Sequence, residues 1–160
     1  MPGSTDAIRD HLSRALDWEE AQVGLRKAAD GIPAEKRGAP APGFEHSPWQ
    51  LLEHIRIAQE DILDFCVNAQ YVHARKWPDD YWPRDPAPPD ESAWATALAS
   101  YASTLDEMKR LVRDVDDLTA RVPTGKANHT YLRAILLVID HTAYHVGQLV
   151  AVRRALGIWT

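Results

Sequence analysis

Apolar residues recur every three to four positions through most of this 160-residue chain. Between residues 47 and 68, for example, one helical face collects apolar side chains while charged side chains take the other face. The apolar positions there are Leu51, Ile55, Ala58, Ile62 and Phe65. No stretch alternates strictly between apolar and polar residues, as a half-buried strand would. The spacing therefore predicts an all-α protein.

The start of the helix at 47–68 carries the strongest local signal in the chain. Ser47 and Gln50 have the spacing of a capping box, in which each side chain bonds the backbone N–H of the other residue. Pro48 occupies the first helical position, where its missing N–H costs nothing. We expect this helix to begin at Ser47 and to end near Asn68.

Two more helices are predicted in the second half of the chain. Residues 91–114 keep an apolar stripe from Trp94 to Val112. The last helix is expected to begin at Thr130, as the N-cap, and to stop at Gly157 in a C-terminal cap. A loop around Pro123 and Gly125 separates the two helices.

The first helical segment covers residues 5–30 and stops before Gly31 and Pro33. Asp17 followed by Glu20 resembles an internal N-cap, so the segment is either one helix or two. Residues 33–46, which are rich in Pro, Gly and Ala, are predicted to be a loop.

A long connection is predicted between the helices at 47–68 and 91–114. Residues 69–90 hold five of the eleven prolines, so they cannot form a long helix. Trp77 and Trp82 would order this connection by packing on the helices. Four helices with one long crossover indicate a four-helix bundle, and the length suits a single domain spanning residues 1–160.

The charge and the cysteine content narrow the classes of function. A net charge of -5 and a pI near 5.8 argue against nucleic acid as a partner, because such proteins usually carry a basic patch. The longest apolar run, residues 134–139, is far below the ~20 residues that cross a bilayer, and no secretory signal is visible. Cys66 is the single cysteine, which suits a cytoplasmic location and excludes cysteine-rich zinc sites. Any metal must be bound by histidines and carboxylates.

His141 and His145 are four residues apart in the last predicted helix. At ~100° per residue they lie ~40° apart on the helix and ~6 Å apart along its axis, so both rings can reach one ion. The same spacing also fits two histidines that fill a core, so both interpretations remain open.

The helix that carries these histidines is apolar on two sides. One stripe includes Leu136, and a second stripe, which includes Leu137, surrounds the histidines. We therefore expect both sides to be buried, one against the protein's own core and the other under a second cover, such as a partner subunit.

His54 is a third histidine that is predicted to point inward, from the helix at 47–68. Three imidazoles from two facing helices would form a His₃ site, which leaves a fourth metal position open to water or substrate. The alternative is that each ring bonds a backbone carbonyl or a carboxylate. Asp61 lies two turns after His54, about 10.5 Å along the helix, so it suits a pocket-lining acid better than a ligand.

The remaining candidates have simpler explanations. Cys66 is expected to pack as a small core residue, and Arg153 and Arg154 suit the C-terminal end of a helix dipole. Trp49, Trp77, Trp82 and Trp94 are expected to anchor the core and the loops, and those in the crossover could roof a pocket. The histidines not expected to be ligands are His11, His46, His73 and His129.

Two stretches resemble the DinB-like family of bacterial four-helix-bundle proteins. They are SPWQLLEHIRIAQEDIL at residues 47–63 and LLVIDHTAYHVGQLVAVRRALGIW at residues 136–159. The segment KWPDDYWP and the helix at Trp94 are similar to one subgroup. The most specific elements are His54 and the HxxxHxGQ pattern from His141 to Gln148.

The resemblance implies an up-down-down-up bundle that often forms a homodimer. It implies that His54, His141 and His145 bind a divalent metal, nickel or zinc. Members of the wider superfamily include thiol-dependent S-transferases, in which the metal activates a low-molecular-weight thiol, and a mycothiol-dependent isomerase.

Several functions are compatible with these features. The resemblance favours a metal-dependent S-transferase that acts on a small molecule, and a hydrolase is also compatible, since a metal can activate a thiol or a water. Asp61 and Tyr144 are candidates to assist proton transfer, and Gln148 is a candidate partner of His145. The alternatives are a non-catalytic metal-binding or stress-response bundle, and a metal-free dimer whose histidines are core residues.

Overall fold

The structure is a computed structural model that describes residues 4–159. Within these residues it contains helices and one isolated β-bridge, between Arg121 and Thr130, but no strand. The elements are α1 (Ser4–Ala15), α2 (Leu25–Ala29), η1 (Ala34–Lys36), α3 (Pro48–Val67), η2 (Asp79–Tyr81), α4 (Ala93–Asp114) and α5 (Tyr131–Ala155). The all-α prediction is confirmed. The single-domain prediction extends to residues 1–3 and 160, which lie outside the described residues.

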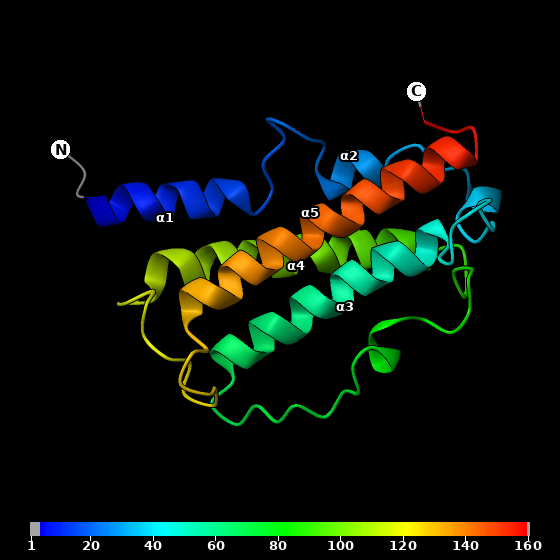
Figure 1. Cartoon of the computed structure of the whole chain (residues 1–160). Coiled ribbons are helices and arrows are strands. Elements are labelled where there is room, and N and C mark those ends of the chain that lie inside the picture. The colour runs from blue at the N-terminus through cyan, green and yellow to red at the C-terminus, as the bar shows by residue number, and fades with distance from the viewer. Residues whose placement is uncertain (1–3, 160) are drawn as a thin grey trace.

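The helix directions follow the order expected of the bundle. In Figure 1, α1 and α5 run one way, while α3 and α4 run the other way. The crossover between α3 and α4 returns the chain along the length of α3, which allows these two helices to be parallel. The main packing contacts join α3 to α4 and α3 to α5, so α3 lies in the middle of the core.

The first helical segment is two helices rather than one. α1 ends at Ala15, and α2 begins at Leu25 after an irregular stretch, so Asp17 does not cap a helix as the sequence suggested. The carboxylate of Asp17 instead accepts a hydrogen bond from Lys109 at 2.6 Å, and Glu19 accepts one from the backbone N–H of Gly24 at 3.1 Å. These side chains serve tertiary contacts and a turn, so the helix is interrupted there.

The first turns of α3 and α5 are capped as the sequence predicts. The Ser47 hydroxyl accepts a hydrogen bond from the Gln50 backbone N–H at 3.2 Å, and the Gln50 side chain accepts one from the Ser47 N–H at 3.1 Å. The Thr130 hydroxyl accepts a bond from the Arg133 N–H at 3.2 Å. Gly157, just after α5, has a φ of 70°, as expected of a C-terminal cap.

The crossover is ordered by contacts with α3. The Gln50 side chain donates to the carbonyl of Pro83 at 2.9 Å, and the Ser47 hydroxyl donates to the carbonyl of Pro86. Within the crossover, Tyr81 is buried, whereas Trp77 remains mostly exposed. The crossover therefore forms a fixed cover along α3.

The burial of α5 differs from the prediction at two positions. Ile135, Val138 and Leu149 are buried in the core, but Leu136 and Leu137 are 49% and 40% exposed. The expectation that both apolar sides of this helix are buried is therefore wrong at these two leucines. At Leu136 the reason is that α1 contacts α5 only weakly and leaves a hollow of about 1380 Å³ between α1, α4 and α5, which Leu136 lines and Leu137 does not.

By length and composition alone, α5 could cross a membrane, because its most apolar window has a mean hydropathy of 1.4. Core helices of soluble proteins can reach the same value. We attribute the apolar sequence of α5 to its packing against α3, which buries Ile135 and Leu149 completely.

Two residues near the end of α5 also have specific environments. A Cβ added at Gly147 would meet nothing within 4 Å, so no helix of the described chain approaches closely there. Arg153 is buried rather than exposed at the helix end, and it donates to the carbonyls of Ala28 at 2.7 Å and Ile158 at 3.0 Å. Its guanidinium therefore ties α2 and the C-terminal segment to α5.

Candidate metal centre

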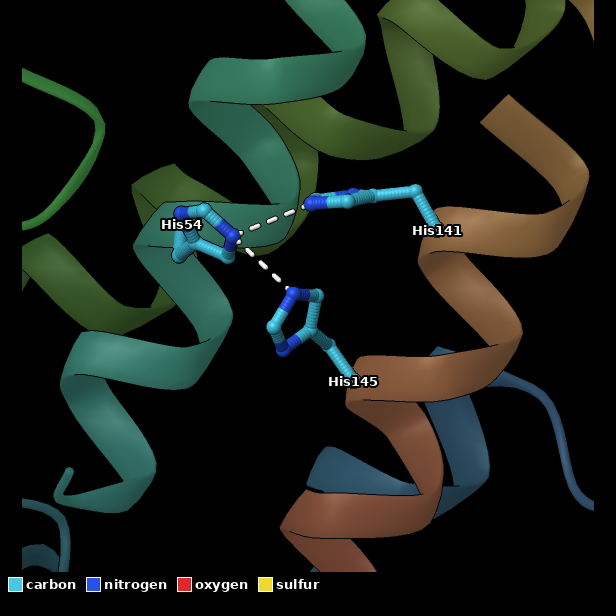
Figure 2. A group of neighbouring side chains, drawn as sticks. All are labelled: His54, His141 and His145. Carbon is cyan, nitrogen blue, oxygen red and sulfur yellow. Dashed lines mark hydrogen bonds between the residues drawn. The ribbon is translucent and has the colours of Figure 1, made fainter. Parts of the chain in front are cut away.

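Three histidines meet between α3 and α5, as Figure 2 shows. His54 comes from α3, while His141 and His145 come from successive turns of α5. The Nε2 atom of His54 lies 3.0 Å from Nε2 of His141 and 3.0 Å from Nε2 of His145. One ring nitrogen of each histidine lies within 4.8 Å of the others, so the three residues could hold one metal ion.

The three rings are held in their uncharged form by their surroundings. His54 and His145 are buried, and His141 is partly buried. Burial lowers the pKa of His54 and of His141 to about 4 and also lowers the pKa of His145. Neutral imidazoles are the form that binds metals.

The outer nitrogens of two rings have acceptor partners. His54 Nδ1 lies 3.0 Å from the backbone oxygen of Tyr81, and His145 Nδ1 lies 2.7 Å from Oε1 of Gln148. A carbonyl oxygen can only accept a hydrogen bond, so both Nδ1 atoms carry the proton. In a neutral ring the other nitrogen, Nε2, then holds a free lone pair.

With the protons on Nδ1, the Nε2 atoms of His54 and His145 are left without a proton to share. The lone pairs of His54 and His145 face each other at 3.0 Å, where no proton is available to join them. A proton on His141 could satisfy its own contact with His54 but not the second contact. A shared cation would satisfy all three nitrogens, so the donor set fits a divalent metal bound by imidazoles.

The crossover forms one wall of the centre. The ring of Trp82 stacks on His54, with centroids 3.7 Å apart and planes 4° from parallel. On its other side, Trp82 stacks on His46, also at 3.7 Å. A crossover tryptophan, Trp82, therefore packs against the candidate centre, whereas the sequence did not show that His46 lies behind it.

Of the other predicted site residues, Gln148 and Tyr144 contact His145, whereas Asp61 bonds two tyrosines of the crossover. Gln148 accepts from His145, as expected, and its amide donates to the phenol oxygen of Tyr144 at 3.4 Å. Tyr144 is largely exposed, and its ring lies edge-on to His145 at 4.9 Å. Asp61 accepts hydrogen bonds from the phenols of Tyr71 and Tyr81.

The remaining candidates are outside the centre. Cys66 is buried in a small apolar cluster, and burial raises the pKa of its thiol to about 12, which suits packing and not nucleophilic attack. His73 bonds Tyr71, and His129 packs against Phe65. His11 lines the hollow beside α1, away from the three histidines.

Sequence reasoning missed Tyr71 and Tyr81, which connect Asp61 to the crossover, because neither is part of a periodic pattern. The run of aromatic residues in KWPDDYWP was the available signal that this segment packs against something. It could not show which backbone carbonyl would meet His54.

The comparison with protein-family models finds a match to the DinB superfamily over residues 17–149. This range includes His54, His141 and His145 and most of the described chain. The chain belongs to the DinB superfamily. This DinB-superfamily protein matches no curated protein and no solved structure. The family and the histidine cluster therefore agree on a candidate metal centre, while neither identifies a reaction.

Proposed function

We propose that this DinB-superfamily protein is a metal-dependent enzyme of the S-transferase type. His54, His141 and His145 would bind a divalent metal, nickel or zinc. The sulfur of a low-molecular-weight thiol would form a C–S bond with an electrophilic carbon of a small substrate, the bond from that carbon to its leaving group would break, and the thiol proton would pass to solvent. The observation that carries the metal is the facing pair of Nε2 lone pairs of His54 and His145. The choice of thiol transfer rests on the resemblance to thiol-dependent members of the superfamily.

The residues of the chain would perform distinct tasks. Three neutral histidines leave the charge of a divalent cation uncompensated, and Lewis acidity of this kind activates a thiol or a water as a nucleophile. Gln148 and the carbonyl of Tyr81 hold the rings in the metal-binding tautomer. The phenol of Tyr144 would contact a molecule that approaches His145, which is supported by its exposure and by its ring lying 4.9 Å from that of His145. A hydrolase that uses a water instead of a thiol is the second candidate.

Elemental analysis tests the metal part of the proposal. Protein without a histidine tag, purified without a nickel column, is expected to hold about one metal per chain. His54→Ala, His141→Ala and His145→Ala are each expected to lose it while far-UV circular dichroism remains helical. His11→Ala changes an exposed histidine of α1 and is the matched control, which should keep its metal.

Turnover assays test the enzyme part. The wild-type protein would be assayed with bacillithiol, mycothiol or glutathione, a panel of electrophiles, and ester substrates without thiol. Turnover that needs both metal and thiol supports the transferase, and thiol-independent hydrolysis supports the hydrolase. Metal binding without any turnover would favour the non-catalytic alternative, and metal-free wild-type protein would overturn the whole proposal.

We also propose that the protein is a cytoplasmic homodimer in which a second copy covers the face of α5 around Leu136. This leucine is 49% exposed beside an apolar hollow, and Gly147 has open space before it. Sedimentation velocity is expected to give a dimer for the wild type and a monomer for Leu136→Glu. Val67→Glu, at an exposed position at the end of α3, is the control and should leave the dimer intact. A wild-type protein that is monomeric at micromolar concentration would contradict this proposal.

A further inference from the structure

Asp61 lies about two turns after His54 on α3, and its carboxylate bonds the crossover. Its Oδ1 accepts a hydrogen bond from the phenol of Tyr71 at 3.1 Å, and its Oδ2 accepts one from the phenol of Tyr81 at 2.5 Å. Both tyrosines belong to the crossover. One carboxylate on α3 therefore holds two points of the segment that covers the centre.

Tyr81 also contacts His54, one of the candidate metal ligands. Its side chain is 4% exposed, and its backbone oxygen lies 3.0 Å from Nδ1 of His54. Asp61 accepts a hydrogen bond from the phenol of Tyr81, while the backbone carbonyl of the same residue accepts a hydrogen bond from Nδ1 of His54. Tyr81 is thus the single buried residue that connects Asp61 to His54.

The two phenols are suited to remain donors. Burial, together with the nearby carboxylate of Asp61, raises the pKa of Tyr71 to about 12 and also raises the pKa of Tyr81. Both therefore keep their protons at neutral pH and donate hydrogen bonds to the carboxylate of Asp61. The side chains of Ser47 and Gln50, at the start of α3, bond the carbonyls of Pro86 and Pro83, which do not contact the histidines.

We propose that Asp61 is a positioning residue of the metal centre, which sets the metal affinity by holding the carbonyl of Tyr81 against Nδ1 of His54. The inference rests on the metal binding proposed above. Outer partners of metal-binding histidines fix the tautomer and the ring orientation, and removing such a partner typically weakens metal binding about 10- to 100-fold. Here the partner is a backbone carbonyl, so its position depends on whatever holds Tyr81.

The test measures Co²⁺ affinity and the visible absorption of the Co²⁺ complex in Asp61→Asn. This variant keeps the size of the side chain but replaces one acceptor oxygen by an amide that cannot accept. We expect Co²⁺ to bind at least about 10-fold more weakly, with altered visible bands. Asp64→Asn, which removes an exposed carboxylate one turn away on α3, is the matched control and should bind within twofold of the wild type.

A double-mutant cycle shows whether the effect passes through Tyr81. Tyr81→Phe removes only the phenol, so it should weaken Co²⁺ binding to a similar degree, and adding Asp61→Asn to it should cause little further loss. Additive effects would overturn transmission through Tyr81. If Asp61→Asn does not fold, as judged by circular dichroism, Tyr81→Phe alone decides, and wild-type affinity in that variant overturns the proposal.

The outcomes separate this inference from the proposed function. Tight Co²⁺ binding by the wild type together with unchanged binding by Asp61→Asn would overturn the role of Asp61 and leave the metal centre intact. A wild-type protein that binds no Co²⁺ would overturn the metal centre itself and the role of Asp61 with it.

Discussion

Gln148 decides which nitrogen of His145 faces the centre. Its Oε1 accepts from Nδ1 at 2.7 Å, so the lone pair of the ring must lie on Nε2, beside His54. The amide group is oriented in turn by its bond to the phenol of Tyr144. A residue that makes no contact with a metal thus selects the nitrogen that would bind one.

Replacing Gln148 is expected to weaken metal binding without unfolding the protein. Gln148→Met keeps the length of the side chain but removes the acceptor, so Zn²⁺ affinity should fall about 10-fold in a competition titration with a chromophoric chelator. Gln148→Glu restores an acceptor at the same position and should recover most of the affinity. Equal affinity in Gln148→Met and the wild type would show that the ring orientation does not depend on this bond.

At the scale of the element, α3 depends on how its first turn is closed. Ser47 accepts from the N–H of Gln50 and also donates to the carbonyl of Pro86, so one hydroxyl closes the helix and holds the crossover. Because His54 lies less than two turns from this cap, the cap fixes the start of the helix that carries a candidate ligand.

Ser47→Ala is expected to lower the free energy of unfolding by about 0.5–2 kcal/mol, the usual loss for an N-cap serine. The loss should lie at the upper end because the bond to Pro86 is removed as well. Urea unfolding followed by circular dichroism measures it. Ser103→Ala, in the exposed middle of α4, is the matched control and should change the free energy by less than about 0.5 kcal/mol. A loss in Ser47→Ala no larger than in this control would contradict the capping role.

At the scale of the whole molecule, burying neutral histidines makes folding depend on pH. In the unfolded chain these histidines take up protons below about pH 6.5, whereas in the folded, metal-free protein His54 and His141 do so only near pH 4. The unfolded state therefore binds more protons between these values. The contribution of these neutral histidines to the free energy of unfolding is fully present above about pH 6.5 and is lost as the pH falls toward 4.

The metal-free protein is accordingly expected to lose stability between pH 7.5 and pH 5. Each buried histidine contributes a slope that approaches about 1.4 kcal/mol per pH unit. Urea unfolding in the presence of a chelator measures the slope, and staying above pH 5 limits the contribution of carboxylates. His54→Leu should show a shallower slope because one of the histidines is gone. A slope that is the same in this variant would mean that His54 is not held neutral by the fold.

The helices α3, α4 and α5 and the one-turn spacing of His141 and His145 could be predicted from the sequence alone. These features depend on hydrogen bonds and side-chain contacts between residues a few positions apart. A short stretch of sequence is therefore sufficient to predict helix caps, apolar stripes and the i, i+4 spacing. The capping box at Ser47 and the N-cap at Thr130 were predicted correctly for this reason. The family was also indicated by short motifs within these helices.

Contacts between residues on different elements could not be predicted from the sequence and are seen in the fold. The approach of His54 to His145, the stacking of Trp82 between His46 and His54, and the anchoring of Tyr81 by Asp61 join residues that are distant in sequence. The exposure of Leu136 likewise depends on how far α1 lies from α5. Such contacts arise from the packing of whole elements and from an irregular crossover that has no period, so no local pattern in the sequence records them.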